Sequence, residues 1–396
     1  MRRPTHGGNL AWAAALAGCS PSLILDFSAS INPLGPPNSA IAAIERALKD
    51  LSAYPDPHYD QLRVSLSQLH PTLTPDWILP GNGSAELLTW AARELSELKE
   101  TCLLAPAFSD YQRALKAFGA KVREYPIGLQ VGRLQVERLE NNLQPSNLQP
   151  STQFGLQVGR LQVERLENNL QLSNLQLSNL QPSTQRSTLG LLLNNPHNPS
   201  GWLFDREAIL PLVSQFALVV VDEAFMDFLP PNQQQSLISR VQDYPNLVIL
   251  RSLTKFYSLP GLRLGYCVSH PDRLRRWQQW RDPWPVNALA AAAAISVVQD
   301  TEFQQQTWDW LPEARSHLFE GLALLPGLQP YPSAANFLLV QSEQPSSQVQ
   351  VKLLERSRIL IRDCLSFPEL GDRFFRVAVR TEAENQRLLD ALDTIL

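Results

Sequence analysis

Segments with a helical pattern alternate with short apolar segments along most of this chain, and this alternation restricts the fold more than any other feature. The predicted strands before residue 287 are residues 77–80, 101–105, 121–125, 189–193, 217–221 and 246–250. The predicted helices are residues 40–51, 59–70, 85–97, 111–118 and 206–216. Strands that alternate with helices form mainly parallel sheets covered by helices on both faces. We therefore predict an α/β fold.

The order of elements changes near residue 287. The predicted helices are then residues 288–298, 308–324, 349–357 and 382–395, and the predicted strands are residues 336–341 and 374–379. This pattern indicates a smaller α+β domain appended to the large one. We divide the chain into an N-terminal arm (1–45) that packs with the small domain, a large domain (46–286) and a small domain (287–396).

A repeat interrupts the large domain. The segment Gly128–Leu139 recurs at Gly155–Leu166, and a Gln-, Asn- and Leu-rich tract continues to residue 187. Solenoids need several stacked repeats, whereas an insertion into a surface loop adds little loop-closure entropy. We interpret residues 128–187 as a disordered or semi-ordered insertion. Short amphipathic helices or a partner-binding arm are the alternatives.

Composition excludes several classes of partner and location. The formal net charge of −4 argues against nucleic acid or an anionic membrane as the main partner. The four cysteines show no metal-ligand or CxxC spacing, which is typical of thiols in a reducing compartment. No segment has the apolar length of a signal peptide or a membrane span, so we expect a cytoplasmic protein without a bound metal.

Lys255 follows the predicted strand 246–250, with Ser252 three residues before it and Arg263 eight residues after it. A lysine amine can form a Schiff base with an aldehyde cofactor such as pyridoxal phosphate, and hydroxyls and a guanidinium can bind the cofactor's phosphate. We expect Lys255 in the loop beyond the carboxyl end of the strand, where ligands of open α/β sheets bind. The alternative is a surface lysine beside a Gly-Leu-Arg turn.

Two other strand ends carry polar side chains. Asn198 lies in a Pro- and Asn-rich turn after strand 189–193, and Asp222 directly follows strand 217–221. A buried carboxylate needs a cationic or hydrogen-bonding partner, and a protonated pyridine nitrogen is one. The alternatives are an Asx turn at Asn198 and a helix cap at Asp222.

Two loops could contact the same ligand. The segment Gly81–Glu86 precedes the predicted helix 85–97, so its backbone N–H groups suit a phosphate, although a plain loop with a Ser cap is the alternative. The segment Pro106–Tyr111 offers aromatic rings for stacking on a planar cofactor, although core packing would explain it equally well.

Taken in this order, these segments resemble the fold type I pyridoxal-phosphate enzymes, and in particular their histidinol-phosphate aminotransferase-like branch. The resemblance covers all of the chain except the insertion, and it implies a seven-stranded sheet in the large domain. Within that branch, four stretches are similar to the decarboxylases that act on O-phospho-L-threonine. They are residues 6–9, 26–35, 361–364 and 375–381.

The resemblance implies a role for each site residue. Lys255 would carry the cofactor, Asp222 would bind its pyridine nitrogen, and Asn198 would donate to its phenolic oxygen. Arg376 would bind the substrate carboxylate. The remaining predicted contacts are the cofactor phosphate with Gly83, Ser84, Ala85, Ser252, Arg263 and, across a dimer interface, Tyr54; the cofactor ring with Phe108; and the substrate phosphate with His6, Asn32 and Arg362.

The implied activity is decarboxylation of O-phospho-L-threonine to (R)-1-aminopropan-2-yl phosphate for cobalamin biosynthesis, by a homodimer with shared active sites. One departure bears on it: Phe225 stands where aminotransferases of this branch commonly carry a tyrosine, which favours decarboxylation over transamination. The alternatives are an aminotransferase acting on histidinol phosphate or a related amino acid, and a catalytically silent scaffold that uses the repeat tract as an interaction arm.

Overall fold

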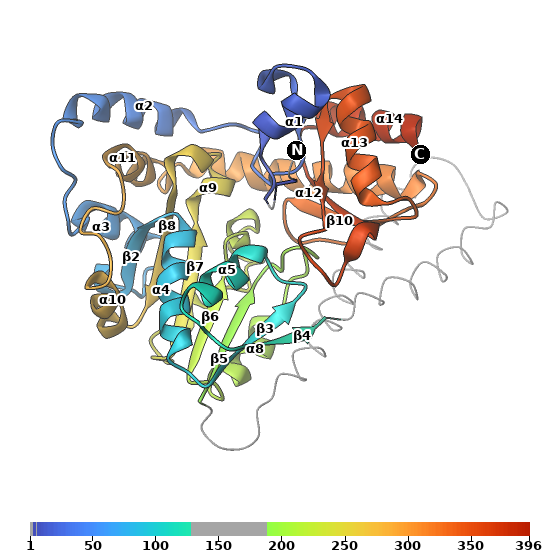
Figure 1. Ribbon diagram of the computed structural model, residues 1–396. Coiled ribbons are helices and arrows are strands. Elements are labelled where there is room, and N and C mark those ends of the chain that lie inside the picture. The colour runs from blue at the N-terminus through green and yellow to red at the C-terminus, as the bar shows by residue number, and fades with distance from the viewer. Residues whose placement is uncertain (1–2, 5, 128–187) are drawn as a thin grey trace.

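The computed structural model describes residues 3–4, 6–127 and 188–396, coloured in Figure 1. The predicted insertion at 128–187 lies outside the described residues. No helix in the described part of the chain is long and apolar enough to cross a membrane. The helices are α1 (Leu10–Ala17), α2 (Asn38–Ala47), α3 (Asp60–Gln68), α4 (Ser84–Ser96), α5 (Ser109–Ala117), α8 (Arg206–Val213), α9 (Leu253–Phe256), α10 (Pro271–Gln278), α11 (Ala288–Val297), α12 (Thr301–Leu324), α13 (Ser346–Ser357) and α14 (Glu382–Ile395).

A seven-stranded sheet forms the larger part of the molecule, with strand order β2-β8-β7-β6-β5-β3-β4. The five strands from β7 to β4 in this order are each parallel to the strand beside them. Strand β8 is antiparallel to both of its neighbours, β2 and β7. The predicted α/β fold with a mainly parallel sheet is therefore confirmed. The strands are β2 (Ile78–Asn82), β3 (Glu100–Ala105), β4 (Val122–Pro126), β5 (Leu189–Asn194), β6 (Leu218–Asp222), β7 (Leu247–Ser252) and β8 (Leu264–Ser269).

Helices bury both faces of the middle of this sheet, which explains why the central strands β5 and β6 are almost continuously apolar, whereas the edge strand β4 is polar and partly exposed. In β6, Leu218 and Val220 belong to the apolar cluster beneath α4, α5 and α10. The alternate residues Val219 and Val221 belong to the cluster that contains α3 and α8. Successive side chains of a strand point to opposite faces, so the even-numbered residue Asp222 at the end of β6 continues the first row.

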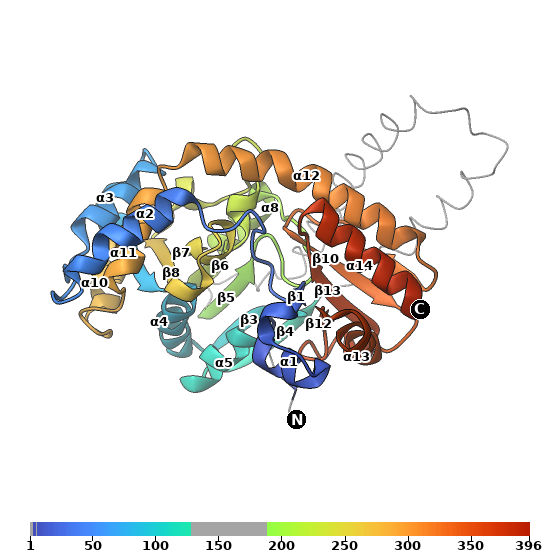
Figure 2. The same ribbon diagram turned by 90° about the horizontal axis from the view of Figure 1, so that it is seen from above.

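The C-terminal part contains a second sheet, of order β12-β13-β10-β9, which is antiparallel throughout. The long helix α12, together with α13 and α14, packs beside it (Figure 2). These features match the predicted α+β pattern, while the predicted boundary at residue 286 stays a prediction. The strands are β9 (Leu328–Pro330), β10 (Phe337–Ser342), β12 (Arg362–Asp363) and β13 (Phe374–Ala378).

The N-terminal arm reaches both parts of the molecule. Its helix α1 packs on α13, and its strand β1 (Leu25–Asp26) pairs in parallel with β11 (Ile359–Leu360). Its helix α2 packs on α11, the first helix of the predicted small domain, but α11 also contacts α3 beside the large sheet. The β1–β11 pair places the following residues of the arm between the two sheets.

The sequence analysis missed β8 and the short helix α9, and it began α12 too late. The segment from Leu264 onward was assigned no element, although its apolar residues are buried and pair with β2 and β7. Helix α12 begins at Thr301 because the Asp300 side chain accepts a hydrogen bond from the Phe303 N–H, which caps the helix.

Candidate active site

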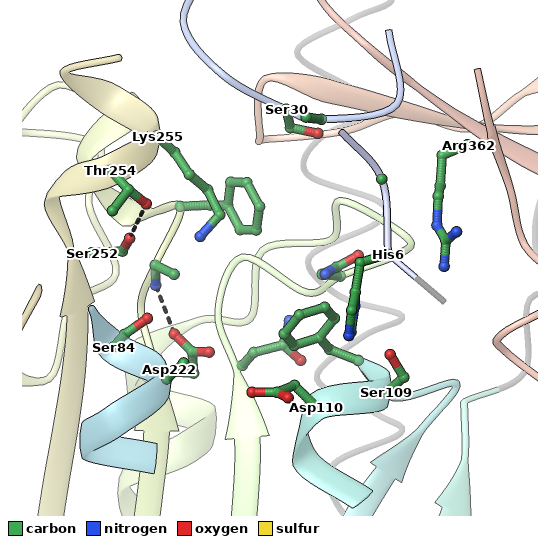
Figure 3. A pocket seen from close by; sticks show the side chains of 18 of the residues that line it. His6, Ser30, Ser84, Ser109, Asp110, Asp222, Ser252, Thr254, Lys255 and Arg362 are labelled. Atoms are coloured by element: carbon green, nitrogen blue, oxygen red, sulfur yellow. Dashed lines mark hydrogen bonds between the residues drawn. The ribbon is translucent and has the colours of Figure 1, made fainter. Parts of the chain in front are cut away.

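A cavity of about 400 Å³ lies where β5, β6 and β7 end. Arg376, from the C-terminal part of the chain, also lines it. So do Arg362, from the same part, and His6 of the N-terminal arm (Figure 3). Thus most predicted site residues come together from three regions of the chain, whereas Gly83, Asn32 and Tyr54 do not line this cavity. The predicted residues that line it are His6, Ser84, Ala85, Phe108, Asn198, Asp222, Ser252, Lys255, Arg263, Arg362 and Arg376.

Asp222 is the last residue of β6, and its carboxylate faces the cavity (Figure 3). Its Oδ2 accepts a hydrogen bond from the Tyr111 hydroxyl at 2.8 Å, and its Oδ1 accepts one from the Ala224 N–H at 3.0 Å. Burial raises the pKa of Asp222, while the Lys255 charge and these two donors lower it. On balance the pKa of Asp222 is raised, so its two described donors and Lys255 do not fully compensate burial, and a further cationic partner would stabilise the carboxylate.

Lys255 lies beyond the carboxyl end of β7 as predicted, but in the four-residue helix α9 rather than in a loop, because the chain turns helical directly after Ser252. Its Nζ lies 4.8 Å from the centre of the Phe225 ring. Burial lowers the pKa of Lys255 to about 8, and the Arg376 and Arg263 charges act in the same direction, while Asp222 opposes them. The neutral amine is therefore far more populated near neutral pH than in an ordinary lysine, and a nucleophilic lysine requires this form.

The N-terminus of α4 meets Arg263 at the cavity. Gly83 has a φ of +76°, and a Cβ there would lie 2.7 Å from Arg263 Nη2. Glycine is therefore needed to let the guanidinium approach the backbone. Ser84 and Ala85, the first residues of the helix, line the cavity beside it. Unpaired N–H groups and a guanidinium together suit a phosphate.

Two hydroxyls complete this side of the cavity. Ser252 Oγ and Thr254 Oγ1 lie 2.8 Å apart, and both residues are buried (Figure 3). Ser252 was predicted as a phosphate contact from its spacing, whereas Thr254 was missed. Its position between Ser252 and Lys255 was the available signal.

Arg376 on β13 reaches across to Asn198, and its Nη1 donates to Asn198 Oδ1. Its guanidinium also lies over the Phe337 ring, 4.7 Å from the ring centre. Burial lowers the pKa of Arg376 to about 10, so it remains a cation at neutral pH. A cation that is held by one amide oxygen and an aromatic face keeps donors free for a carboxylate.

The mouth of the cavity is formed by the arm and the small domain. The His6 ring lies 5.8 Å from the Phe108 ring, centre to centre. Arg362 is buried, donates through Nη1 to the Pro4 carbonyl at 3.4 Å and through Nη2 to Ser366 Oγ at 2.5 Å. Burial lowers the pKa of Arg362, although the Asp363 charge opposes this effect. These contacts tie the arm to the small domain at the pocket.

The structure argues against Asn32 as a substrate contact. Its Nδ2 donates to the Phe256 carbonyl at 2.9 Å and to Thr307 Oγ1 at 2.8 Å, and its Oδ1 accepts from the Leu34 N–H. Ser30, two residues earlier, lines the cavity instead. Its Oγ is buried and has no hydrogen-bond partner among the described residues.

Tyr54 lies away from the cavity in this chain. Its side chain is 80% exposed, and its ring stacks on Trp284 with centres 4.5 Å apart. The prediction was that Tyr54 reaches a phosphate in a second subunit, and it stays a prediction.

The chain belongs to the aminotransferase class I and II family, whose model matches residues 23–392. The predicted fold type I is that of this family. Within the family, the chain is 36% identical to the threonine-phosphate decarboxylase of Salmonella typhimurium, covering 99% of this chain and 96% of that protein. It is 28% identical to the adenosylcobalamin biosynthesis bifunctional protein of Leptospira interrogans, covering 100% of this chain but 41% of that protein. The structure of histidinol-phosphate aminotransferase from Sinorhizobium meliloti in complex with pyridoxal-5'-phosphate superposes with a TM-score of 0.76 at 21% identity, covering 98% of this chain and 94% of that one.

Proposed function

We propose that this chain binds pyridoxal phosphate and decarboxylates O-phospho-L-threonine to (R)-1-aminopropan-2-yl phosphate and CO2, as a step of cobalamin biosynthesis. The observation that carries the proposal is a single cavity that combines a lysine amine of lowered pKa, a carboxylate at a strand end and several guanidinium groups. The similarity to a threonine-phosphate decarboxylase over nearly the whole of both chains supports this substrate. The similarity to a cobalamin biosynthesis protein supports the pathway.

The donor set fits pyridoxal phosphate. Lys255 would hold the cofactor's aldehyde carbon, and Asp222 would hold its ring nitrogen, because each Asp222 oxygen carries one described donor and retains a lone pair. The phosphate would lie at the N-terminus of α4, with Ser84, Ser252 and Arg263. Asn198 would donate through its amide nitrogen, because its oxygen is engaged by Arg376.

When bound, pyridoxal phosphate supplies an electron sink for the bond that breaks at the substrate's Cα. The side chains determine which bond that is. Arg376 would hold the substrate carboxylate in bidentate fashion, and its packing on Phe337 fixes the direction of the guanidinium plane. The bond from Cα to the carboxylate breaks, CO2 leaves, and a proton takes its place. Lys255 lines the same cavity and has a pKa of about 8, which suits a proton donor near neutral pH. We therefore assign this proton transfer to Lys255.

The substrate phosphate would lie at the mouth of the cavity. Arg362 and His6 face this region, and Ser30 replaces Asn32 as the residue of the arm that we assign to the substrate. A buried guanidinium binds a phosphate strongly because little water competes for it. Recognition of two anionic groups, by Arg376 and Arg362, would distinguish a phosphorylated amino acid from an ordinary one.

We also propose a homodimer in which Tyr54 of one subunit reaches the partner's cofactor phosphate. An 80% exposed tyrosine stacked on a tryptophan that is itself 42% exposed supports an interface at this surface. Sedimentation of the purified protein should give twice the chain mass. Tyr54→Phe should weaken cofactor binding without changing that mass.

The test of the activity is direct. The purified protein, incubated with pyridoxal phosphate and O-phospho-L-threonine, should release CO2 without a keto acid. A strict requirement for 2-oxoglutarate would instead support an aminotransferase. This is the second candidate, because the chain belongs to the aminotransferase class I and II family. A protein that binds no cofactor and is unchanged by Lys255→Ala would support the silent scaffold.

A further inference from the structure

Tyr111 contacts the two groups that would define the cofactor's position, although it has no assigned role in the proposed function. It lies in the first turn of α5 and is 2% exposed. Its ring packs in the apolar cluster between α4, α5 and the sheet. Tyr111 also lines the cavity, and its hydroxyl donates to the cavity-facing Asp222. The ring is therefore held by packing, and the hydroxyl has a fixed position.

The hydroxyl has a single described acceptor, Asp222 Oδ2, at 2.8 Å. This bond connects α5 to the end of β6, two elements separated by 111 residues in sequence. Burial raises the pKa of Tyr111 well above its usual value, and the nearby Asp222 charge raises it further. The hydroxyl thus stays protonated and acts as a donor to the carboxylate.

The ring of Tyr111 meets a second site residue. Phe108, at the N-cap of α5, lies with its ring perpendicular to that of Tyr111, and the ring centres are 5.6 Å apart. The Tyr111 N–H also donates to the Phe108 carbonyl at 2.9 Å. Phe108 is the residue expected to contact the face of the cofactor ring, so one side chain contacts both the ring-stacking group and the carboxylate.

We infer that Tyr111 is a positioning residue: its ring fixes Phe108 and its hydroxyl fixes Asp222, so that both groups are in place before the cofactor binds. This inference rests on the proposed function, because it concerns the site for pyridoxal phosphate. The charged and titratable groups that face Asp222 are Lys255 on α9 and, on α5, Asp110 and Tyr111 itself.

The experiment compares cofactor binding in the full chain and in four variants. Tyr111→Phe removes the hydroxyl and keeps the ring, and we expect the dissociation constant for pyridoxal phosphate to rise by about tenfold to a hundredfold, the effect of one charge-assisted hydrogen bond. In an Asp222→Ala background the same change should alter it by less than about twofold, because the acceptor is gone. Tyr331→Phe is the matched control, since it removes a buried hydroxyl that donates to Gln341 Oε1 at 3.0 Å away from the site.

A spectroscopic measurement separates positioning from general stability. Without the Tyr111 donor, the pKa of Asp222 rises, so the carboxylate supports a protonated ring nitrogen less well. The pH midpoint of the bound cofactor's visible absorbance should therefore move to higher pH in Tyr111→Phe and stay unchanged in Tyr331→Phe. The variant Tyr111→Leu also loses the contact with Phe108, and it should reduce the visible circular dichroism of the bound cofactor further.

The outcomes separate the two proposals. If the unsubstituted chain binds no pyridoxal phosphate, the proposed function fails, and this inference fails with it. If the unsubstituted chain binds the cofactor but Tyr111→Phe weakens binding equally with and without Asp222, or leaves the midpoint unchanged, the positioning role alone is overturned.

Discussion

At the ends of β6 and β7, the charged side chains on one face of the sheet line the cavity, whereas those on the other face pair with one another. Asp222 faces the cavity. Glu223, the next residue, lies on the opposite face of the sheet, where it accepts from the N–H of Leu237, a member of the apolar cluster on that face. Ser252 also faces the cavity, whereas Arg251 faces Glu223, with Nε and Oε2 3.0 Å apart. Neighbouring residues thus belong to two different electrostatic environments.

On the far face, the charges are closed into a network. Arg251 forms ion pairs with Glu223 and Asp227, and it donates to Ser236 Oγ at 3.1 Å. Glu223 accepts from the Ser236 hydroxyl at 2.7 Å and from the Leu237 N–H at 2.9 Å. On the cavity face, four cationic side chains accompany two carboxylates, Asp110 and Asp222; the cations are Lys255, Arg263, Arg362 and Arg376. The closed network stabilises the fold, and the excess of cations on the open face needs an anionic ligand.

The largest expected effect comes from removing the amine on the cavity face. Lys255→Met should reduce CO2 release from O-phospho-L-threonine by about a thousandfold or more, because both cofactor attachment and proton transfer are lost. Lys352→Met is the control. Lys352 lies on α13 and donates to Gln344 Oε1 at 2.8 Å, so its replacement should leave the rate unchanged. If Lys255→Met kept the rate, the cavity face would not be the site of the chemistry, and its contrast with the ion-paired face would fail.

Breaking the far-face network should reduce stability rather than chemistry. Arg251→Leu leaves the buried carboxylate of Glu223 and the partly buried carboxylate of Asp227 without their cation, and the free energy of unfolding should fall by about 3–5 kcal/mol. Urea unfolding measures this change. The surface pair Arg240–Asp243 offers a contrast, because its side chains are 36% and 56% exposed. Arg240→Leu should lower the free energy of unfolding by less than about 1 kcal/mol. Equal losses in the two variants would contradict a closed network.

The pH dependence of stability tests the open face. The pKa of Lys255 is about 8 in the folded chain and 10.5 without its surroundings. Between these values the unfolded chain binds the proton that the folded chain has released, so this residue's contribution to stability rises with pH and is least favourable below pH 8. From pH 7 to pH 10, the cofactor-free chain should gain on the order of 2 kcal/mol relative to Lys255→Met. Urea unfolding of both proteins at each pH isolates this residue, and a constant difference would refute the lowered pKa.

Arg376→Lys should have a smaller effect, confined to substrate binding. An ammonium cannot form the bidentate pair with a carboxylate, so KM for O-phospho-L-threonine should rise by about tenfold to a hundredfold. The dissociation constant of the cofactor should change much less, because Arg376 reaches the proposed cofactor site only through Asn198 and does not contact the phosphate-binding residues. Steady-state kinetics and cofactor titration together measure both. An unchanged KM would place the substrate carboxylate elsewhere.

The sequence predicted the open face well because its residues follow apolar strands. Asp222 and Ser252 end β6 and β7, and the parallel order of these strands brings their ends together. The closed network was not predicted, because nothing in the sequence pairs Arg251 with Asp227. Ser30 was passed over for Asn32 because the segment after β1 has no regular period. Its orientation is set by the pairing of β1 with β11, more than 300 residues away in sequence.

The smallest expected effect concerns the two phenylalanine rings that lie beneath Lys255 and Arg376. Phe225 packs edge-on against Phe337 with ring centres 5.0 Å apart, and the two rings lie under Lys255 and Arg376 respectively. Phe225→Tyr keeps this packing and adds a hydroxyl beside the cavity. One added hydrogen bond changes a free energy by about 0.5–1.5 kcal/mol, so CO2 release should change by roughly threefold to tenfold. Because aminotransferases of this branch commonly carry tyrosine here, the ratio of keto-acid-dependent amino transfer to CO2 release should rise. Measuring both products from one reaction gives this ratio, and an unchanged value would show that Phe225 does not decide which bond breaks.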